Sequence, residues 1–164
     1  MRAAVTKAAG AGLALLLLAL PAAAGPRVAV PGLDFTDTSG EARDQGAEHA
    51  ARLALFATTL RAGLAEGGIE VVVPDCDCTP LRTPFKAMAE ATRAAGGELL
   101  LVGGVHKVST LIGSVKLTLI DLAADKALCT RVLSYRGDSD EAWTRAAEFA
   151  AEDVLRACFP APGN

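Results

Sequence analysis

The chain has 164 residues, of which 51% are apolar and 21% charged, and its formal net charge is −3. This length predicts a single domain. A mildly acidic chain without a basic stripe argues against a nucleic-acid partner and against an anionic membrane surface.

Residues 1–24 have the pattern of a secretory signal peptide. Arg2 and Lys7 form a short basic region that an apolar stretch follows, and residues 22–24 are alanines, the small residues that signal peptidase requires. The apolar stretch has about 13 residues, whereas crossing a bilayer takes roughly 20, so we expect cleavage and no membrane span afterwards. Residues 25–164 are then predicted to form one secreted α/β domain with a net charge of −5, located in the periplasm or outside the cell.

The first half of this domain predicts two strand-helix units. Residues 27–35 indicate a strand, which Pro31 interrupts and so places at an edge or a bulge. Residues 47–65 predict a helix because leucine and phenylalanine recur at helical spacing. The β-branched residues 69–73 predict a second strand, and residues 84–95 predict a second helix.

The second half predicts three strands and a final helix. Residues 99–108 begin with a continuous apolar run, typical of a central strand, and residues 115–120 and 127–135 follow as further strands. Ser139 is a predicted N-cap for a helix that ends near Cys158. The order β-α-β-α-β-β-β-α predicts an α/β (α+β) fold with a single mixed β-sheet of about five strands and helices packed on it.

Three segments together resemble a family of small secreted bacterial proteins catalogued as a domain of unknown function. They are residues 28–39, which include Asp-Phe-Thr-Asp-Thr-Ser; residues 97–109, which end in His-Lys-Val-Ser; and residues 135–143, Tyr-Arg-Gly-Asp-Ser-Asp-Glu-Ala-Trp. This family is similar in layout to the amino-terminal domain of TolB and to the curli-secretion lipoprotein, which act through protein contacts. The resemblance therefore implies a periplasmic binding or adaptor protein with a protein partner, and it favours a non-enzymatic role.

The four cysteines all follow the leader, and an even number in an exported chain predicts disulfides. Cys158 on the final helix and Cys129 on the fifth predicted strand can meet, because that helix must cover the sheet. Cys76 and Cys78 pair either with these two or with each other. Alternatively, Cys76 and Cys78 stay free and hold a soft metal ion or exchange disulfides, which would make the chain a metal- or thiol-handling accessory protein.

No other pattern predicts a catalytic residue, a cofactor or a metal site. His49 and His106 lie far apart in the sequence, whereas a tetrahedral metal site needs three or four ligands. The acidic residues between Asp34 and Asp44 lack the spacing of a calcium loop and are interpreted as turn-forming. Gly103-Gly104 precedes no phosphate-binding motif and is interpreted as a bulge.

A partner surface is predicted where residues 107–114 lie near the start of the final helix. Its candidate residues are Lys107, Ser109 and Trp143. Trp143 is the only tryptophan, and it is predicted either to pack in the core or to contact the partner, with its indole N–H hydrogen-bonded if buried.

Overall fold

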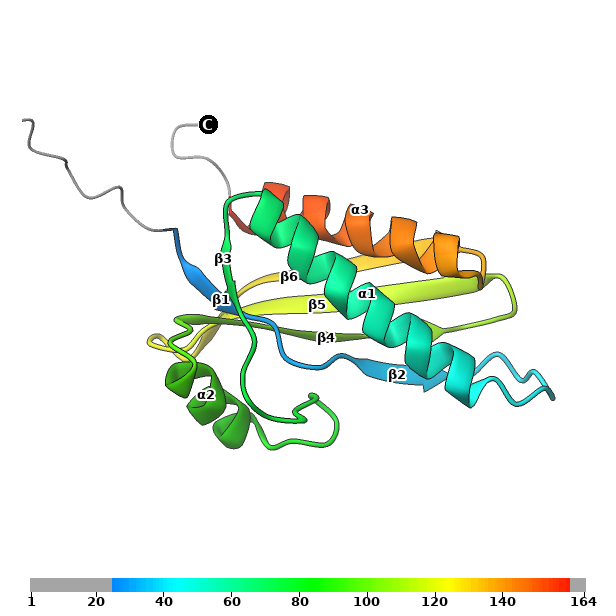
Figure 1. Ribbon diagram of the computed structural model, residues 1–164, viewed down its shortest axis with the longest axis horizontal. Coiled ribbons are helices and arrows are strands. Elements are labelled where there is room, and N and C mark those ends of the chain that lie inside the picture. Colours follow the sequence, from blue (N-terminus) through cyan, green and yellow to red (C-terminus); the bar gives the residue numbers. More distant parts are fainter. Residues whose placement is uncertain (1–24, 160–164) are drawn as a thin grey trace, which may run out of the picture.

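The computed structural model describes residues 25–159, in which six strands form one mixed sheet with helices packed on it (Figure 1). The predicted leader lies outside these residues. The elements are β1 (Arg27–Ala29), β2 (Asp34–Asp37), α1 (Gly46–Glu66), β3 (Glu70–Val72), α2 (Phe85–Ala94), β4 (Leu99–Lys107), β5 (Ile112–Asp121), β6 (Lys126–Arg136) and α3 (Asp140–Cys158). This arrangement confirms the predicted fold class.

The sheet has one strand more than predicted, because the first predicted strand is divided into β1 and β2. Pro31 lies between the two parts, and proline has no N–H to donate to a strand ladder. The Arg61 guanidinium of α1 fills this break, donating hydrogen bonds of 3.0 and 2.9 Å to the carbonyl oxygens of Val30 and Pro31.

The strand order is β3-β1-β4-β5-β6, and β2 pairs with the last part of β4. The pairs of β1 with β3, and of β1 and β2 with β4, are parallel, whereas β4–β5 and β5–β6 are antiparallel. Parallel and antiparallel pairs therefore fall where the predicted β-α-β units and hairpins require them. The strand β6 forms one edge of the sheet.

Helices α1 and α3 lie side by side over one face of the sheet (Figure 1). The main core between them and the sheet contains the fully buried Phe56, Leu60 and Trp143. A Cβ at Gly63 would lie only 2.7 Å from the Cβ of Ala151, so small residues let the two helices approach closely. A smaller second core joins α2 to the opposite face.

The bulge predicted at Gly103-Gly104 is absent, and this prediction was wrong. Pairing of β4 with β5 is continuous there, and the irregularity lies instead between β5 and β6 at Leu119. The glycines serve close strand packing: a Cβ on Gly103 would overlap the carbonyl of Lys116, and one on Gly104 would lie 2.8 Å from the carbonyl oxygen of Asp34. Within residues 25–159, none of the helices combines the length and the apolar character needed to cross a membrane.

Candidate functional site

The three segments that carry the family resemblance meet at one end of the sheet. The parallel strands β2 and β4 both end there, and β6 ends there too because it runs antiparallel to β5, which runs antiparallel to β4. The turn after β6 and the first turns of α1 close this end of the molecule (Figure 1). Residues 37–38, 106–107 and 137–138 are thereby brought together although they are far apart in the sequence.

Asp138 is the centre of a charge cluster at this end, which we define as Glu41, His49, Arg52, Lys107 and Asp138. Oδ2 of Asp138 lies 2.8 Å from Lys107 Nζ and 3.1 Å from His49 Nε2. Oδ1 accepts hydrogen bonds of 3.1 Å from Arg52 Nη1 and 3.0 Å from the indole Nε1 of Trp143. Burial alone would raise the pKa of Asp138, but the hydrogen bonds from Lys107, His49 and Trp143 outweigh it and hold that pKa well below its usual range.

The ammonium group of Lys107 is almost fully buried, with only 3% of the residue exposed. It contacts the carboxylates of Glu41 and Asp138, and it donates a 2.7 Å hydrogen bond to the Gln45 side-chain oxygen. Burial lowers the pKa of Lys107, but the hydrogen bonds to Asp138 and Glu41 more than compensate and raise that pKa. The hydrogen bond from Lys107 in turn lowers the pKa of Glu41.

His49 is 3% exposed and lies among aromatic rings. Its ring centroid is 4.8 Å from that of Phe35 and 6.1 Å from that of Trp143. Its Nδ1 atom lies 3.9 Å from a carboxylate oxygen of Asp37, on the side opposite Asp138. The ring therefore connects β2, α1 and the turn before α3, and both of its nitrogens face carboxylates.

Through these contacts the charge cluster holds α1, β4 and the turn before α3 together. Each side chain in it is engaged by a group of opposite charge or by a hydrogen bond. Nearby, His106 Nε2 lies 2.7 Å from the Thr38 hydroxyl, but none of the described carboxylates contacts His106 to orient it as a base. In the described part of the chain, no group of three or more His, Cys, Asp or Glu is placed to hold a metal ion.

The cluster gives the stability of the protein a defined pH dependence. The carboxyls of Asp138 and Glu41 have lowered pKa values in the fold, so the unfolded chain binds more protons as the pH falls. We expect the free energy of unfolding to be constant between about pH 5 and pH 10 and to decrease progressively below about pH 4, where free carboxyls titrate. The raised pKa of Lys107 preserves its contribution up to about pH 10, and that contribution is lost at higher pH.

Urea unfolding followed by far-UV circular dichroism between pH 3 and pH 10 measures the acid limb and the plateau of this profile. The variant Asp138→Asn is the control, because it removes the group whose pKa is lowered most and should flatten the acid limb. A free energy of unfolding that rises between pH 5 and pH 3 would contradict the assignment.

The predicted partner surface needs correction for two of its three residues. Lys107 is 3% exposed and Trp143 is fully buried, so neither side chain is available to a partner. Of the two alternatives for Trp143, core packing holds. Ser109 lies half-buried in the β4–β5 hairpin, where its hydroxyl accepts a 3.2 Å hydrogen bond from the amide of Ile112. Beside it, Val108 and Leu111 expose apolar side chains at the hairpin tip.

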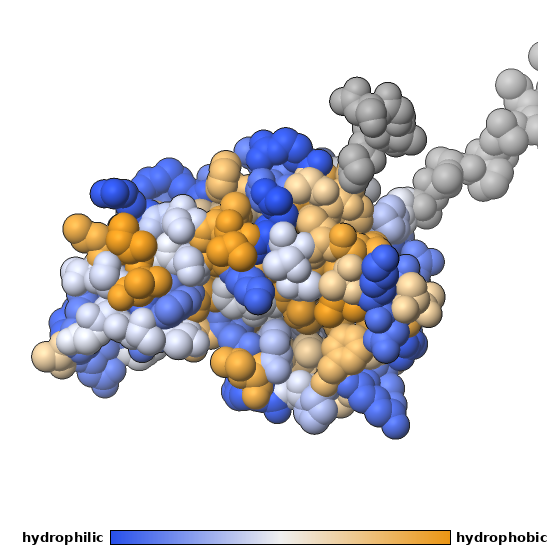
Figure 2. Space-filling view, turned by 180° about the vertical axis from the view of Figure 1, so that it is seen from behind, coloured by the Kyte–Doolittle hydropathy of each residue, from blue (hydrophilic) through white to orange (hydrophobic). Residues whose placement is uncertain are grey.

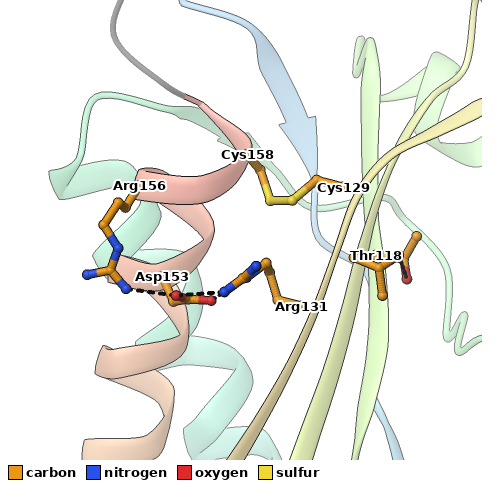
Figure 3. Close-up of a disulfide and its surroundings, with 7 residues drawn as sticks. Thr118, Cys129, Arg131, Asp153, Arg156 and Cys158 are labelled. Atoms are coloured by element: carbon orange, nitrogen blue, oxygen red, sulfur yellow. Dashed lines mark hydrogen bonds and ion pairs between the residues drawn. A yellow bond between two sulfur atoms is a disulfide. The ribbon is translucent and has the colours of Figure 1, made fainter. Parts of the chain in front are cut away.

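Both cysteine pairs form disulfides in the structure. Cys129 on β6 is bonded to Cys158 at the end of α3, which ties this helix to the edge strand (Figure 3). One and a half turns earlier on α3, Asp153 accepts hydrogen bonds from Arg131 of β6 and from Arg156 (Figure 3). Cys76 is bonded to Cys78 in the loop between β3 and α2, so none of the four thiols is free.

The sheet has a partly uncovered face, which we define as the side of β4, β5 and β6 that points away from α1 and α3. Helix α2 covers only the end of this face near Leu100. The remainder carries polar and apolar side chains together, and Figure 2 shows hydrophobic patches between hydrophilic ones on this side. A groove of about 380 Å³ lies on it, bordered by Leu81 and floored by Gly104, Lys116 and Thr118.

Comparison with known families identifies the family of this chain. Residues 26–155 match the family DUF3280, described as "Protein of unknown function (DUF2380)". The chain belongs to this family. The match includes all three segments on which the resemblance rests, and it confirms the predicted membership in a family of unknown function. Among curated proteins, none matches the sequence.

Two solved structures resemble this DUF3280 domain at low sequence identity. The PelC dodecamer from Paraburkholderia phytofirmans is 18% identical, with a TM-score of 0.53 over 81% of this chain and 87% of that one. TolB from Acinetobacter baumannii is 15% identical, with a TM-score of 0.49 over 85% of this chain and 29% of that one. The PelC similarity shows a common fold.

Proposed function

We propose that this protein is an exported binding or adaptor domain that acts through protein contacts in the periplasm. The observation that carries the proposal is the partly uncovered sheet face, on which Val132 is 66% exposed and whose groove is bordered by Leu81, 76% exposed. Apolar side chains displayed on one face are typical of an interaction surface. The charge cluster at the end of the sheet has its groups engaged internally, so it supports the fold that presents this face.

Three further observations support an extracytoplasmic protein-contact role. Stable disulfides form in oxidising compartments, and both cysteine pairs of this chain are bonded. The leader pattern of residues 1–24 agrees with export. The chain shares its fold with PelC, which was solved as a dodecamer. This fold is therefore compatible with assembly through protein contacts.

The alternative, metal or thiol handling by Cys76 and Cys78, requires free thiols. Their disulfide leaves this alternative without an observation in its favour. Non-reducing peptide mapping of protein purified from the periplasm would detect the Cys76–Cys78 bond directly, and two alkylatable thiols at these positions would revive the alternative.

Site-specific photo-crosslinking in the periplasm tests the proposed function. A photoreactive residue replaces either Leu81 on the uncovered face or Phe149 on the outer side of α3, which are 76% and 49% exposed. We expect a discrete heavier adduct from position 81 and none from position 149, because only the first lies on the proposed contact surface. Absence of an adduct at position 81, or equal adducts at both positions, would contradict the proposal.

A further inference from the structure

The edge strand β6 is long and has no strand paired with its outer side. It contains 11 residues, and in the described part of the chain it pairs only with β5. From Cys129 to Arg136 its ladder with β5 is regular, after an irregularity near its start. An edge of this length offers a row of unpaired N–H and C=O groups, which proteins normally block with proline, charge or a covering element.

The side chains of β6 leave its centre open to strand pairing. The one charge in the middle of the strand, Arg131, is turned onto α3, where its Nε and Nη2 lie 2.6 and 3.2 Å from the Asp153 carboxylate. Val132 is 66% exposed, and Thr130 beside it is exposed as well. Exposed β-branched residues favour a further cross-strand neighbour.

The charges of β6 specify what kind of strand fits. Lys126, Arg131 and Arg136 are its charged residues, and it contains no acidic one. Lys126 and Arg136 at its two ends form no ion pair within residues 25–159. If two copies of β6 paired antiparallel about their centres, Lys126 would lie opposite Arg136 and Arg131 opposite Arg131. Like charges directly opposite are destabilising, so a second copy of this strand is a poor partner.

We propose that β6 receives an extended acidic segment of the protein partner as an additional strand of the sheet. This inference rests on the proposed function and specifies the recognition mode. Main-chain hydrogen bonds along the edge would supply the affinity, and carboxylates of the segment facing Lys126 and Arg136 would supply the selectivity. The added strand would extend the uncovered face beyond β6.

A peptide titration tests this inference on the protein purified from the periplasm. The probe is the capped peptide Glu-Thr-Val-Thr-Val-Thr-Val-Thr-Val-Thr-Glu, which has the length of β6 so that its two glutamates can face Lys126 and Arg136, and its control has glutamine in place of both glutamates. We expect amide chemical shifts to change, and hydrogen exchange to slow, along residues 130–136. Arg136→Glu should weaken binding at least fivefold, whereas Arg145→Glu on the exposed side of α3 should leave it unchanged, although the net charge changes equally.

Three outcomes would overturn the strand-pairing inference. They are equal binding of the glutamine peptide, shifts that map away from β6, and shifts in β6 produced by raising the protein concentration alone, which would indicate pairing with a second copy. Failure of the inference is distinguishable from failure of the proposed function. An adduct at position 81 without any β6 protection would remove the strand pairing only, whereas loss of both would remove the adaptor role as well.

Discussion

Replacing Asp138 by alanine is expected to lower the free energy of unfolding by about 3–5 kcal/mol, the cost of removing one partner from a buried ion pair. The change leaves the ammonium of Lys107 buried without one of its two carboxylates, and it removes the acceptor of the Trp143 indole N–H. His49 loses the closer of its two carboxylate contacts as well. Urea denaturation followed by far-UV circular dichroism measures the loss.

Asp140→Ala is the matched control for this prediction. Asp140 contacts Arg52 at 2.9 Å, yet its side chain is 73% exposed, so its removal is expected to cost less than about 1 kcal/mol. Adding Lys107→Met to Asp138→Ala removes the uncompensated charge and should restore about half of the lost stability. Equal effects of Asp138→Ala and Asp140→Ala, or no recovery in the double variant, would show that the buried charge is not the cause.

Removing the Cys129–Cys158 disulfide by the double substitution to alanine is expected to cost about 3–4 kcal/mol. This bond joins residues 29 positions apart, and the entropy that a cross-link removes from the unfolded chain grows with the length of the loop it closes. The Cys76–Cys78 bond closes a loop of only 2 positions, so its removal is expected to cost about 1–2 kcal/mol.

The Cys76/Cys78 double variant is therefore the control for the Cys129/Cys158 double variant. Urea unfolding of each, beside the unmodified protein in the absence of reductant, gives the two differences. A larger loss from the Cys76/Cys78 variant than from the Cys129/Cys158 variant would contradict the structural role assigned to each bond.

The fold could be predicted from the sequence because its signals are local. The apolar spacing of α1, the continuous run that begins β4 and the N-cap before α3 each lie within one element. The division of the first strand could also have been predicted from Pro31. The alternation of residues along β4 and the composition of the sequence did not indicate that its glycines serve close packing rather than a bulge. That role depends on how closely β2 and β5 approach β4.

The charge cluster could be predicted only in part. Lys107 follows Leu101 and Val105 at the even spacing of a strand, which places it on the buried face and requires a carboxylate partner. That signal was present in the sequence. The identity of the partners was not, because Asp138 and Glu41 come from turns distant in the chain, and an aspartate in Arg-Gly-Asp is equally typical of a turn. The prediction of a surface role for Lys107 failed because it did not apply this even spacing to Lys107.

Partner capture and folding are best measured together, in the same protein. The photoreactive residue stays at position 81, and Lys116→Glu is introduced on the floor of the neighbouring groove. Lys116 is exposed and forms no ion pair in the described part of the chain, so the melting temperature should not change. We expect the adduct to disappear while the melting temperature is retained. An adduct that persists, or one that is lost only together with the fold, would contradict this expectation.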